Sequence, residues 1–110
     1  MLEKDFQSVV IKLATGLGWT VAHFRTSAPR LRQMSAGAKG FPDLVLAHEK
    51  TGDVIFRELK RDGEKADPAQ VAWGRLLRGQ DYAVWRPADL EHIRHRLSHP
   101  RDAFSGCGHL

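Results

Sequence analysis

A predicted β-hairpin at Phe41–Lys60, with the sequence FPDLVLAHEKTGDVIFRELK, constrains the fold of this chain more than any other stretch. Two short apolar runs, at 45–47 and 54–56, are separated by the polar residues 48–53, which include a glycine. Apolar, β-branched runs joined by a short polar turn with glycine are typical of a hairpin. We therefore expect two antiparallel strands joined by a turn at 49–52.

The register of this hairpin follows from the position of its turn. Val45 then faces Phe56, and Asp43 faces Glu58, with Cβ atoms about 4.5–5.5 Å apart. Lys60 lies two residues beyond Glu58, so it projects from the same face. Two carboxylates this close repel each other unless a cation lies between them or one is protonated. The hairpin therefore predicts a site that collects an aspartate, a glutamate and a lysine.

Hydrophobic periodicity and turn residues predict the elements around the hairpin. Residues 2–17 carry apolar side chains at the spacing of an amphipathic helix. Asp67, Pro68 and Gln70 form a capping-box pattern that begins a second helix, which Gly79 closes. The other expected elements are a strand at 19–26, a loop at 27–40, a polar connection at 61–66, a strand at 82–86 and a helix at 87–97.

The order of these elements predicts an α/β fold with a mixed sheet flanked by helices, each of which has one apolar stripe to bury. The helix that begins at Asp67 connects the second hairpin strand to the strand at 82–86, so we expect these two strands to be parallel. A chain of 110 residues has room for one core. We expect a single domain over residues 1–97 and a loose tail over 98–110.

The overall composition is that of a globular domain without disulfides. Hydrophobic residues make up 42% and charged residues 27% of the chain, which are ordinary values for a soluble protein. No apolar run approaches the roughly 18 residues that span a bilayer, and the first twenty residues lack the layout of a signal peptide. The single cysteine, Cys107, fits a reducing compartment. We expect a cytoplasmic protein with no membrane partner and, in the absence of a Gly-rich phosphate loop, no nucleotide cofactor.

Basic residues are concentrated in one segment. The formal net charge is +4, and residues 25–41 include Arg25, Arg30, Arg32 and Lys39 but no acid. Such a segment is typical of phosphate contact, although a merely solvated loop would have the same composition. A loop of this length is usually functional or mobile. The charge pattern therefore favours an anionic partner.

The hairpin and its neighbours resemble a known group of nucleases. Asp43, followed after 14 intervening residues by the sequence ELK at 58–60, resembles the PD-(D/E)XK nuclease superfamily. The sequence GFPDL at 40–44, then ELK, then Gln70 on the next helix, is similar to the virus-type replication-repair nuclease (VRR-NUC) family within it. The resemblance covers residues 2–97 and implies a restriction-endonuclease-like fold of order αβββαβα. Compact members of this family occur in phages and bacteria, where they would serve DNA repair.

This resemblance implies a metal-dependent DNA endonuclease that hydrolyses phosphodiester bonds. Asp43 and Glu58 would hold Mg²⁺ or Mn²⁺ together with the main-chain carbonyl of Leu59, because hard divalent cations prefer oxygen ligands. Lys60 would orient or deprotonate the attacking water, or stabilise the charged phosphate, and the sequence leaves these roles open. The alternative for these residues is an ordinary cross-strand ion pair.

Gln70 and Glu3 each have a structural and a functional interpretation. The third helical position of a capping box explains Gln70 fully, whereas the resemblance places a glutamine of this helix beside the catalytic site. Glu3 favours the N-terminus of its helix electrostatically, whereas the resemblance implies an acid there that approaches the metal. Both residues are candidate catalytic residues.

The substrate is expected to be DNA, held through its phosphates by basic residues. These candidates are Arg25, Arg30, Arg32, Lys39, Arg61 and Lys65. No element reads as a recognition helix, which favours structure-selective cleavage of branched DNA such as Holliday junctions. The likeness to junction resolvases implies a homodimer, since two sites are needed to cut two strands. The alternatives are a flap- or restriction-type nuclease and a non-catalytic DNA-binding module.

Other candidate ligands carry weaker signals. His92 and His95 are three apart on the last expected helix, a spacing that can bind a metal, but solvent-facing histidines have the same pattern. Cys107 and His109 are too few for a zinc site, which normally takes four ligands. The three tryptophans, Trp19, Trp73 and Trp85, lie in periodic elements and are expected in the core.

Overall fold

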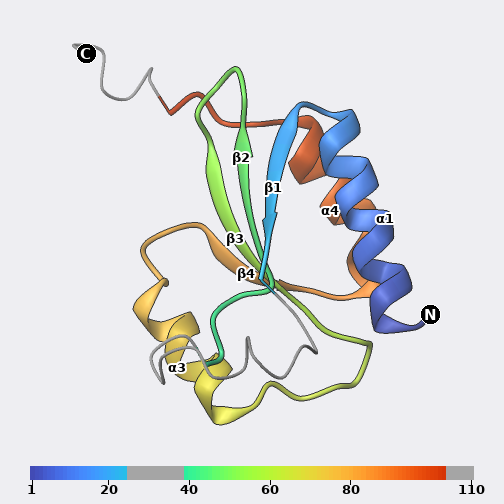
Figure 1. Cartoon of the computed structure of the whole chain (residues 1–110), viewed down its shortest axis with the longest axis vertical. Coiled ribbons are helices and arrows are strands. Elements are labelled where there is room, and N and C mark those ends of the chain that lie inside the picture. The colour runs from blue at the N-terminus through green and yellow to red at the C-terminus, as the bar shows by residue number, and fades with distance from the viewer. Residues whose placement is uncertain (25–38, 104–110) are drawn as a thin grey trace.

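The computed structural model describes residues 1–24 and 39–103 as an α/β fold in which helices flank a four-stranded mixed sheet (Figure 1). In chain order the elements are α1 (Glu3–Gly16), β1 (Trp19–His23), β2 (Leu44–His48), β3 (Val54–Leu59), α3 (Pro68–Leu76), β4 (Tyr82–Trp85), the short 3-10 helix η2 (Pro87–Asp89) and α4 (Leu90–Ser98). This order confirms the predicted fold class. No helix within the described ranges is both long and apolar enough to cross a bilayer.

The sheet has the strand order β1-β2-β3-β4. β2 pairs antiparallel with both β1 and β3, and β3 pairs parallel with β4 as the intervening helix predicts. Val45 faces Phe56, and the His48 N–H donates to the Asp53 carbonyl over 2.8 Å, so the predicted hairpin register is confirmed. Gly52 closes the turn with a φ of 75°, a backbone conformation that favours glycine.

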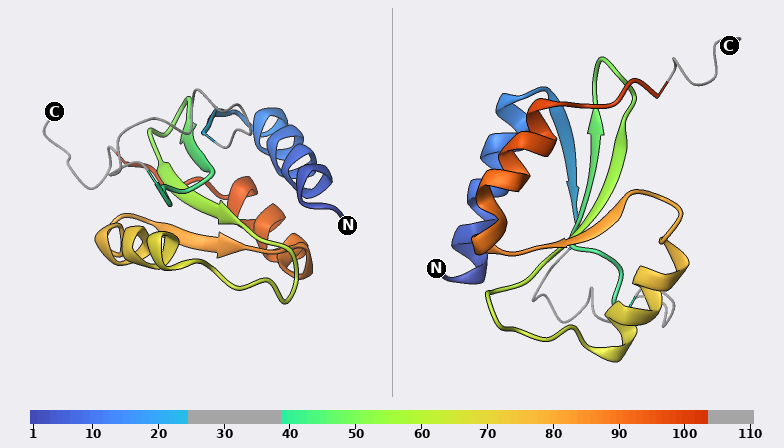
Figure 2. Two further views of the ribbon diagram at one scale, coloured as in Figure 1. Left: turned by 60° about the horizontal axis from the view of Figure 1, so that its bottom comes forward. Right: turned by 180° about the vertical axis from the view of Figure 1, so that it is seen from behind.

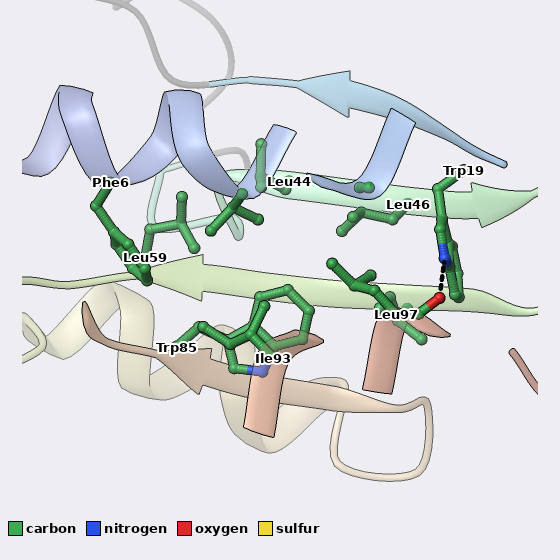
Figure 3. Packing of buried hydrophobic residues seen from close by; sticks show 11 residues of the cluster. Phe6, Trp19, Leu44, Leu46, Leu59, Trp85, Ile93 and Leu97 are labelled. Carbon is green, nitrogen blue, oxygen red and sulfur yellow. Dashed lines mark hydrogen bonds between the residues drawn. The ribbon is translucent and has the colours of Figure 1, made fainter. Parts of the chain in front are cut away.

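The hydrophobic core lies on the face of the sheet that α1 and α4 cover (Figure 2). Strand residues that alternate toward this face, among them Leu44, Leu46 and Ile55, form one buried cluster with Phe6 of α1. Trp19 closes one end of the core, where its indole N–H donates to the Leu97 carbonyl over 2.9 Å (Figure 3). The core expectation therefore holds for Trp19, and it holds likewise for Trp85, which is 2% exposed.

Helix α3 lies apart from α1 and α4, beside one end of the sheet (Figure 1), and it contacts the face opposite the core only lightly. It contributes no buried residue, and Val71 and Leu76 are 44% and 70% exposed. Trp73 is half-buried and packs edge-to-face on Phe41, with ring centroids 4.9 Å apart. The expectation that every helix buries an apolar stripe is therefore wrong for α3, which is held by a few close contacts. Trp73 is not a core residue.

A network of arginines and aspartates links the turn of the hairpin and strand β3 to α4 and to the loop before β4. Arg57 of β3 donates to the Asp81 carboxylate over 2.9 Å. Arg96 of α4 donates both to Asp81, over 2.7 Å, and to Asp53 in the hairpin turn, over 2.8 Å. Burial and the charge of Arg96 lower the pKa of Arg57, but its hydrogen bond to Asp81 opposes them. These pairs link segments that are distant in the sequence.

The chain after α4 is held against the hairpin turn. The Arg101 N–H donates to the Asp53 carboxylate over 2.8 Å, and the Ala103 N–H donates to the Thr51 carbonyl over 2.9 Å. The expectation of a loose tail from Ser98 is therefore wrong for residues 98–103, because main-chain hydrogen bonds anchor them. Residues 104–110 lie outside the described ranges.

Candidate active site

The candidate carboxylates of the hairpin lie on the face of the sheet opposite the core. Ile55 and Leu59 alternate into the core, so Phe56 and Glu58 of the same strand project from the other face. Asp43 directly precedes β2 and shares this second face, because Leu44 after it is in the core. The hairpin therefore brings both predicted carboxylates to the face that α3 approaches.

Asp43 joins three strands through its backbone and side chain. Its carboxylate Oδ2 accepts a hydrogen bond from the Leu59 N–H over 2.8 Å, and its carbonyl accepts one from the Phe24 N–H over 2.9 Å. The backbone pairing of β2 with β3 ends at Leu44 and Arg57, so the Asp43 carboxylate accepts the next N–H, where a carbonyl would continue the ladder. Asp43 is 7% exposed, and this bond fixes its side chain beside the residue that follows Glu58.

Glu58 is 1% exposed and is oriented by Gln70 of α3. The Gln70 side-chain amide donates to Glu58 Oε2 over 2.7 Å. The other end of the same amide completes the capping box, since Gln70 Oε1 accepts from the Asp67 N–H over 2.9 Å and Asp67 Oδ1 accepts from the Gln70 N–H over 3.0 Å. The capping interpretation of Gln70 is therefore confirmed, and the same amide contacts Glu58, whereas a catalytic role of Gln70 stays a prediction.

Lys60 is a buried cation between two acids. It is 5% exposed, and its Nζ lies 3.9 Å from Glu58 Oε2 and 3.8 Å from Glu64 Oε2. A buried ammonium is costly unless it is paired, so both acids stabilise it. Glu64 was not predicted as a site residue. Its spacing of four from Lys60 is the only signal in the sequence, and that signal is specific only in a helix, whereas here it lies in a loop.

The two carboxylates create a negative field on this face. Burial raises the pKa of Tyr82, the first residue of β4, and the charges of Glu58 and Asp43 raise it further. The backbone of Tyr82 pairs in register with that of Phe56, and its ring lies against Gly74 of α3, where an added Cβ would stand 3.0 Å from it. Tyr82 is therefore a neighbour of the acid pair that the sequence analysis did not identify.

The oxygen donors at the open end of the hairpin, away from its turn, fit a hard divalent cation. Asp43 and Glu58 supply carboxylates, and the Leu59 carbonyl belongs to the residue whose N–H donates to the Asp43 carboxylate. Among residues 1–24 and 39–103, no group of three or more His, Cys, Asp or Glu side chains is arranged to hold a metal. Mg²⁺ is often bound by only one or two carboxylates, with water completing an octahedron. The donor set is therefore chemically suited to Mg²⁺ or Mn²⁺.

The remaining candidates within the described residues belong to α1 and to the loops beside the hairpin. Glu3 is half-buried in the first turn of α1, one turn before Phe6, which lies beside Leu59 (Figure 3). Lys39, Arg61 and Lys65 are exposed on the loops that flank the hairpin end. Arg25, Arg30 and Arg32 lie outside the described residues, as do Cys107 and His109.

The histidines of α4 face solvent. His92 and His95 are exposed, and the His95 ring stacks on His99 with centroids 4.2 Å apart. His99 Nδ1 lies 2.7 Å from the His95 carbonyl, which explains the stacked geometry without a ligand. The solvent-facing interpretation of these histidines therefore accounts for their placement.

Comparisons with protein-family models, with curated proteins and with solved structures find no match to this chain. A functional assignment therefore depends on the residues themselves and on their geometry. The distinctive feature is a pair of buried carboxylates on adjoining strand ends. One is held by a main-chain N–H and the other by a side-chain amide, and a buried lysine lies beside them.

Proposed function

We propose that the chain is a divalent-metal-dependent endonuclease that hydrolyses phosphodiester bonds in DNA. The observation that carries this proposal is the buried pair Asp43 and Glu58 beside Lys60. Burying two acids and one lysine on a single face stabilises a fold poorly, since apolar residues of similar volume would serve as well or better. Such an arrangement is typical of a site whose charges act on a ligand.

Each residue of the site would have a separate role in catalysis. A bound Mg²⁺ or Mn²⁺ would supply a nucleophilic water and relieve the negative charge on the phosphate. Asp43 and Glu58 would hold the cation, and the bonds from the Leu59 N–H and the Gln70 amide keep both carboxylates in fixed orientations. Lys60 brings a positive charge to the same place, where it orients the water or neutralises the phosphate.

The substrate follows from the charge of the surrounding loops. Lys39, Arg61 and Lys65 are exposed near the hairpin end and carry the charge that phosphate contacts require. Phosphate contacts set affinity and register without reading base sequence. We therefore propose structure-selective cleavage, with branched DNA such as a four-way junction as the leading substrate. A homodimer would supply the second site for a symmetric cut, and sedimentation with and without junction DNA would test it.

Cleavage of labelled DNA tests the proposed activity. Four-way junction, flap and linear duplex substrates are incubated with Mg²⁺ or Mn²⁺ and with wild type, Glu58→Gln or Asp62→Asn. Asp62 is an exposed acid of the neighbouring loop whose Oδ1 accepts from the Ala88 N–H, and an asparagine keeps that acceptor. We expect cleavage by wild type and Asp62→Asn, and a loss of at least about 100-fold in Glu58→Gln.

The same panel separates the alternatives. Preference for the flap or for linear duplex would indicate a flap- or restriction-type nuclease with the same site. If the protein binds DNA in a salt-sensitive way but cleaves none of the substrates with either metal, it is a non-catalytic module. Equal cleavage by wild type and Glu58→Gln would refute a catalytic role for the acid pair.

A further inference from the structure

An exposed aromatic ring adjoins the candidate active site. Phe24 directly follows β1 and exposes 52% of its surface, although phenylalanine is usually buried. Its N–H donates to the main-chain carbonyl of Asp43 over 2.9 Å, so its backbone lies beside that of the first of the two site acids. Trp19 and Val21 of β1 pack into or against the core. By alternation, Phe24 therefore projects from the face that carries Asp43 and Glu58.

The ring of Phe24 is supported from one side. It meets Phe41 edge-to-face, with centroids 5.4 Å apart and an interplanar angle of 88°. Phe41 in turn meets Trp73 of α3 at 4.9 Å and Phe56 of β3 at 6.4 Å, both also edge-to-face. These contacts form a cluster of aromatic rings around Phe41, and Phe24 is its exposed member. Phe24 therefore combines a fixed position with a surface open to a ligand.

We infer that Phe24 is a stacking platform for an unpaired base of the DNA next to the phosphate that the Asp43 and Glu58 site would cleave. Flat apolar rings beside phosphate-binding surfaces hold single-stranded bases by stacking, and they accept every base because each has a π-face. A base inside a duplex has both faces covered by its neighbours and cannot stack on the ring without being extruded. The preferred substrates are therefore DNAs with an unpaired nucleotide at the cleavage point, such as an open junction or a gap.

This inference deepens the proposed nuclease function, and binding measured in EDTA separates the two. Fluorescence anisotropy compares a single strand, a gapped duplex and a fully paired duplex of equal length. Phe24→Leu keeps an apolar contact for Phe41 but removes the aromatic face, whereas Phe24→Trp keeps that face. Val54→Ala is the matched control, because Val54 is 45% exposed but lies at the turn end of β3.

Phe24→Leu should bind the single strand and the gapped duplex roughly 5- to 150-fold more weakly, the usual effect of removing one base–aromatic stack. Its affinity for paired duplex should equal that of wild type, and Phe24→Trp and Val54→Ala should bind all three DNAs like wild type. Unchanged binding of the single strand by Phe24→Leu would overturn the inference, as would an equal loss for all three DNAs. Because EDTA prevents metal-dependent cleavage, a selective loss supports stacking even if the chain cuts no DNA.

A second measurement needs no variant and covers the case in which Phe24→Leu unfolds. The gapped duplex carries 2-aminopurine at its unpaired position, and wild-type protein is added in EDTA. Stacking of that base on Phe24 should lower its emission on binding, whereas 2-aminopurine placed in the paired arm should not respond. Binding without any change in emission at the gap would contradict the inference.

Discussion

The side-chain amide of Gln70 makes two contacts, one in the capping box of α3 and one with Glu58. Substitutions can separate the effects of these contacts. Asp67→Ala and Gln70→Ala each break the capping box of α3, which should lower the free energy of unfolding by about 1 kcal/mol in both variants. Only Gln70→Ala also removes the donor to Glu58. We therefore expect urea denaturation to give similar losses, and cleavage assays to show a loss of about 10-fold or more in Gln70→Ala alone. Equal activity of the two variants would mean that the Gln70–Glu58 bond has no catalytic role.

Asp81 is the acid on which the buried arginine network depends. It accepts hydrogen bonds from Arg57 and Arg96, whose side chains are 4% and 9% exposed. Asp81→Asn removes the charged carboxylate to which buried Arg57 donates, so we expect a loss of about 3 kcal/mol in the free energy of unfolding. Glu91→Gln is the control, because the Glu91–Arg94 pair has the same 2.9 Å distance as Asp81–Arg57 but is exposed. That variant should lose less than about 1 kcal/mol in urea denaturation, and equal losses would contradict this account.

The same aspartate predicts how stability depends on pH. Burial raises the pKa of Asp81, but hydrogen bonds from Arg96 and Arg57 outweigh burial and hold it below its ordinary value. The unfolded chain therefore binds this proton more readily than the folded chain does. The contribution of Asp81 to stability is present above the unfolded pKa of about 4 and is lost as the pH falls through the lower, folded value.

Urea denaturation between neutral and acidic pH measures this effect in wild type and Asp81→Asn. The free-energy difference between the two proteins should be largest at neutral pH and should shrink below about pH 4, since other carboxylates contribute equally to both. A difference that stays constant over the whole range would rule out Asp81 as the titrating group.

At the scale of elements, the position of α3 depends on a glycine in the segment that leads to Asp43. Gly40 has a φ of 84°, and a Cβ added there would lie 2.4 Å from the Ala69 carbonyl carbon in the first turn of α3. Gly63 has a similar φ of 81°, but nothing lies within 4 Å of its added Cβ. Gly63→Ala therefore isolates the cost of the backbone conformation, and Gly40→Ala adds a collision with the helix.

We expect Gly63→Ala to lose about 1 kcal/mol of stability in thermal or urea denaturation, and Gly40→Ala to lose a further 1–3 kcal/mol or so. Gly40→Ala should also reduce cleavage, because it shifts α3 and with it the Gln70 amide that orients Glu58. If both variants retain the same stability and activity, the close approach of Gly40 to α3 does not position the site.

Elements with strong local signals could be predicted from the sequence. The polar turn fixed the register of the hairpin, and the Asp67-Pro68-Ala69-Gln70 pattern marked the start of α3, because both signals depend on neighbouring residues. The shared face of Asp43 and Glu58 follows from that register and the two-residue period of a strand. Local patterns therefore account for the centre of the candidate site.

The remaining features depend on tertiary packing and left no local trace. Arg57 and Asp81 are separated by 24 positions, and Phe24 and Asp43 belong to different strands, so only the folded sheet brings each pair together. The light attachment of α3 also escaped prediction, since an apolar stripe does not reveal whether a partner surface exists to cover it. Hydrophobic periodicity alone thus overestimated what the domain can bury.

In the whole molecule, the two faces of the sheet have different roles. One face packs against α1 and α4 and contains the core that stabilises the domain (Figure 2). The other face carries the acid pair, Lys60 and the cluster of aromatic rings around Phe41, and it is covered only lightly by α3. Substitutions that neutralise the acid pair should therefore leave the core intact, which allows the site to be tested in a folded protein.

Binding of Mn²⁺ tests most directly whether Asp43 and Glu58 hold a catalytic divalent cation. Electron paramagnetic resonance of free Mn²⁺ measures its binding to wild type, Asp43→Asn and Asp62→Asn. An asparagine at position 43 can still accept the Leu59 N–H through its side-chain oxygen, so the fold should persist. We predict saturable Mn²⁺ binding by wild type and Asp62→Asn, and its weakening by at least about 10-fold in Asp43→Asn. Equal Mn²⁺ binding by all three proteins, or none by wild type, would contradict the claim.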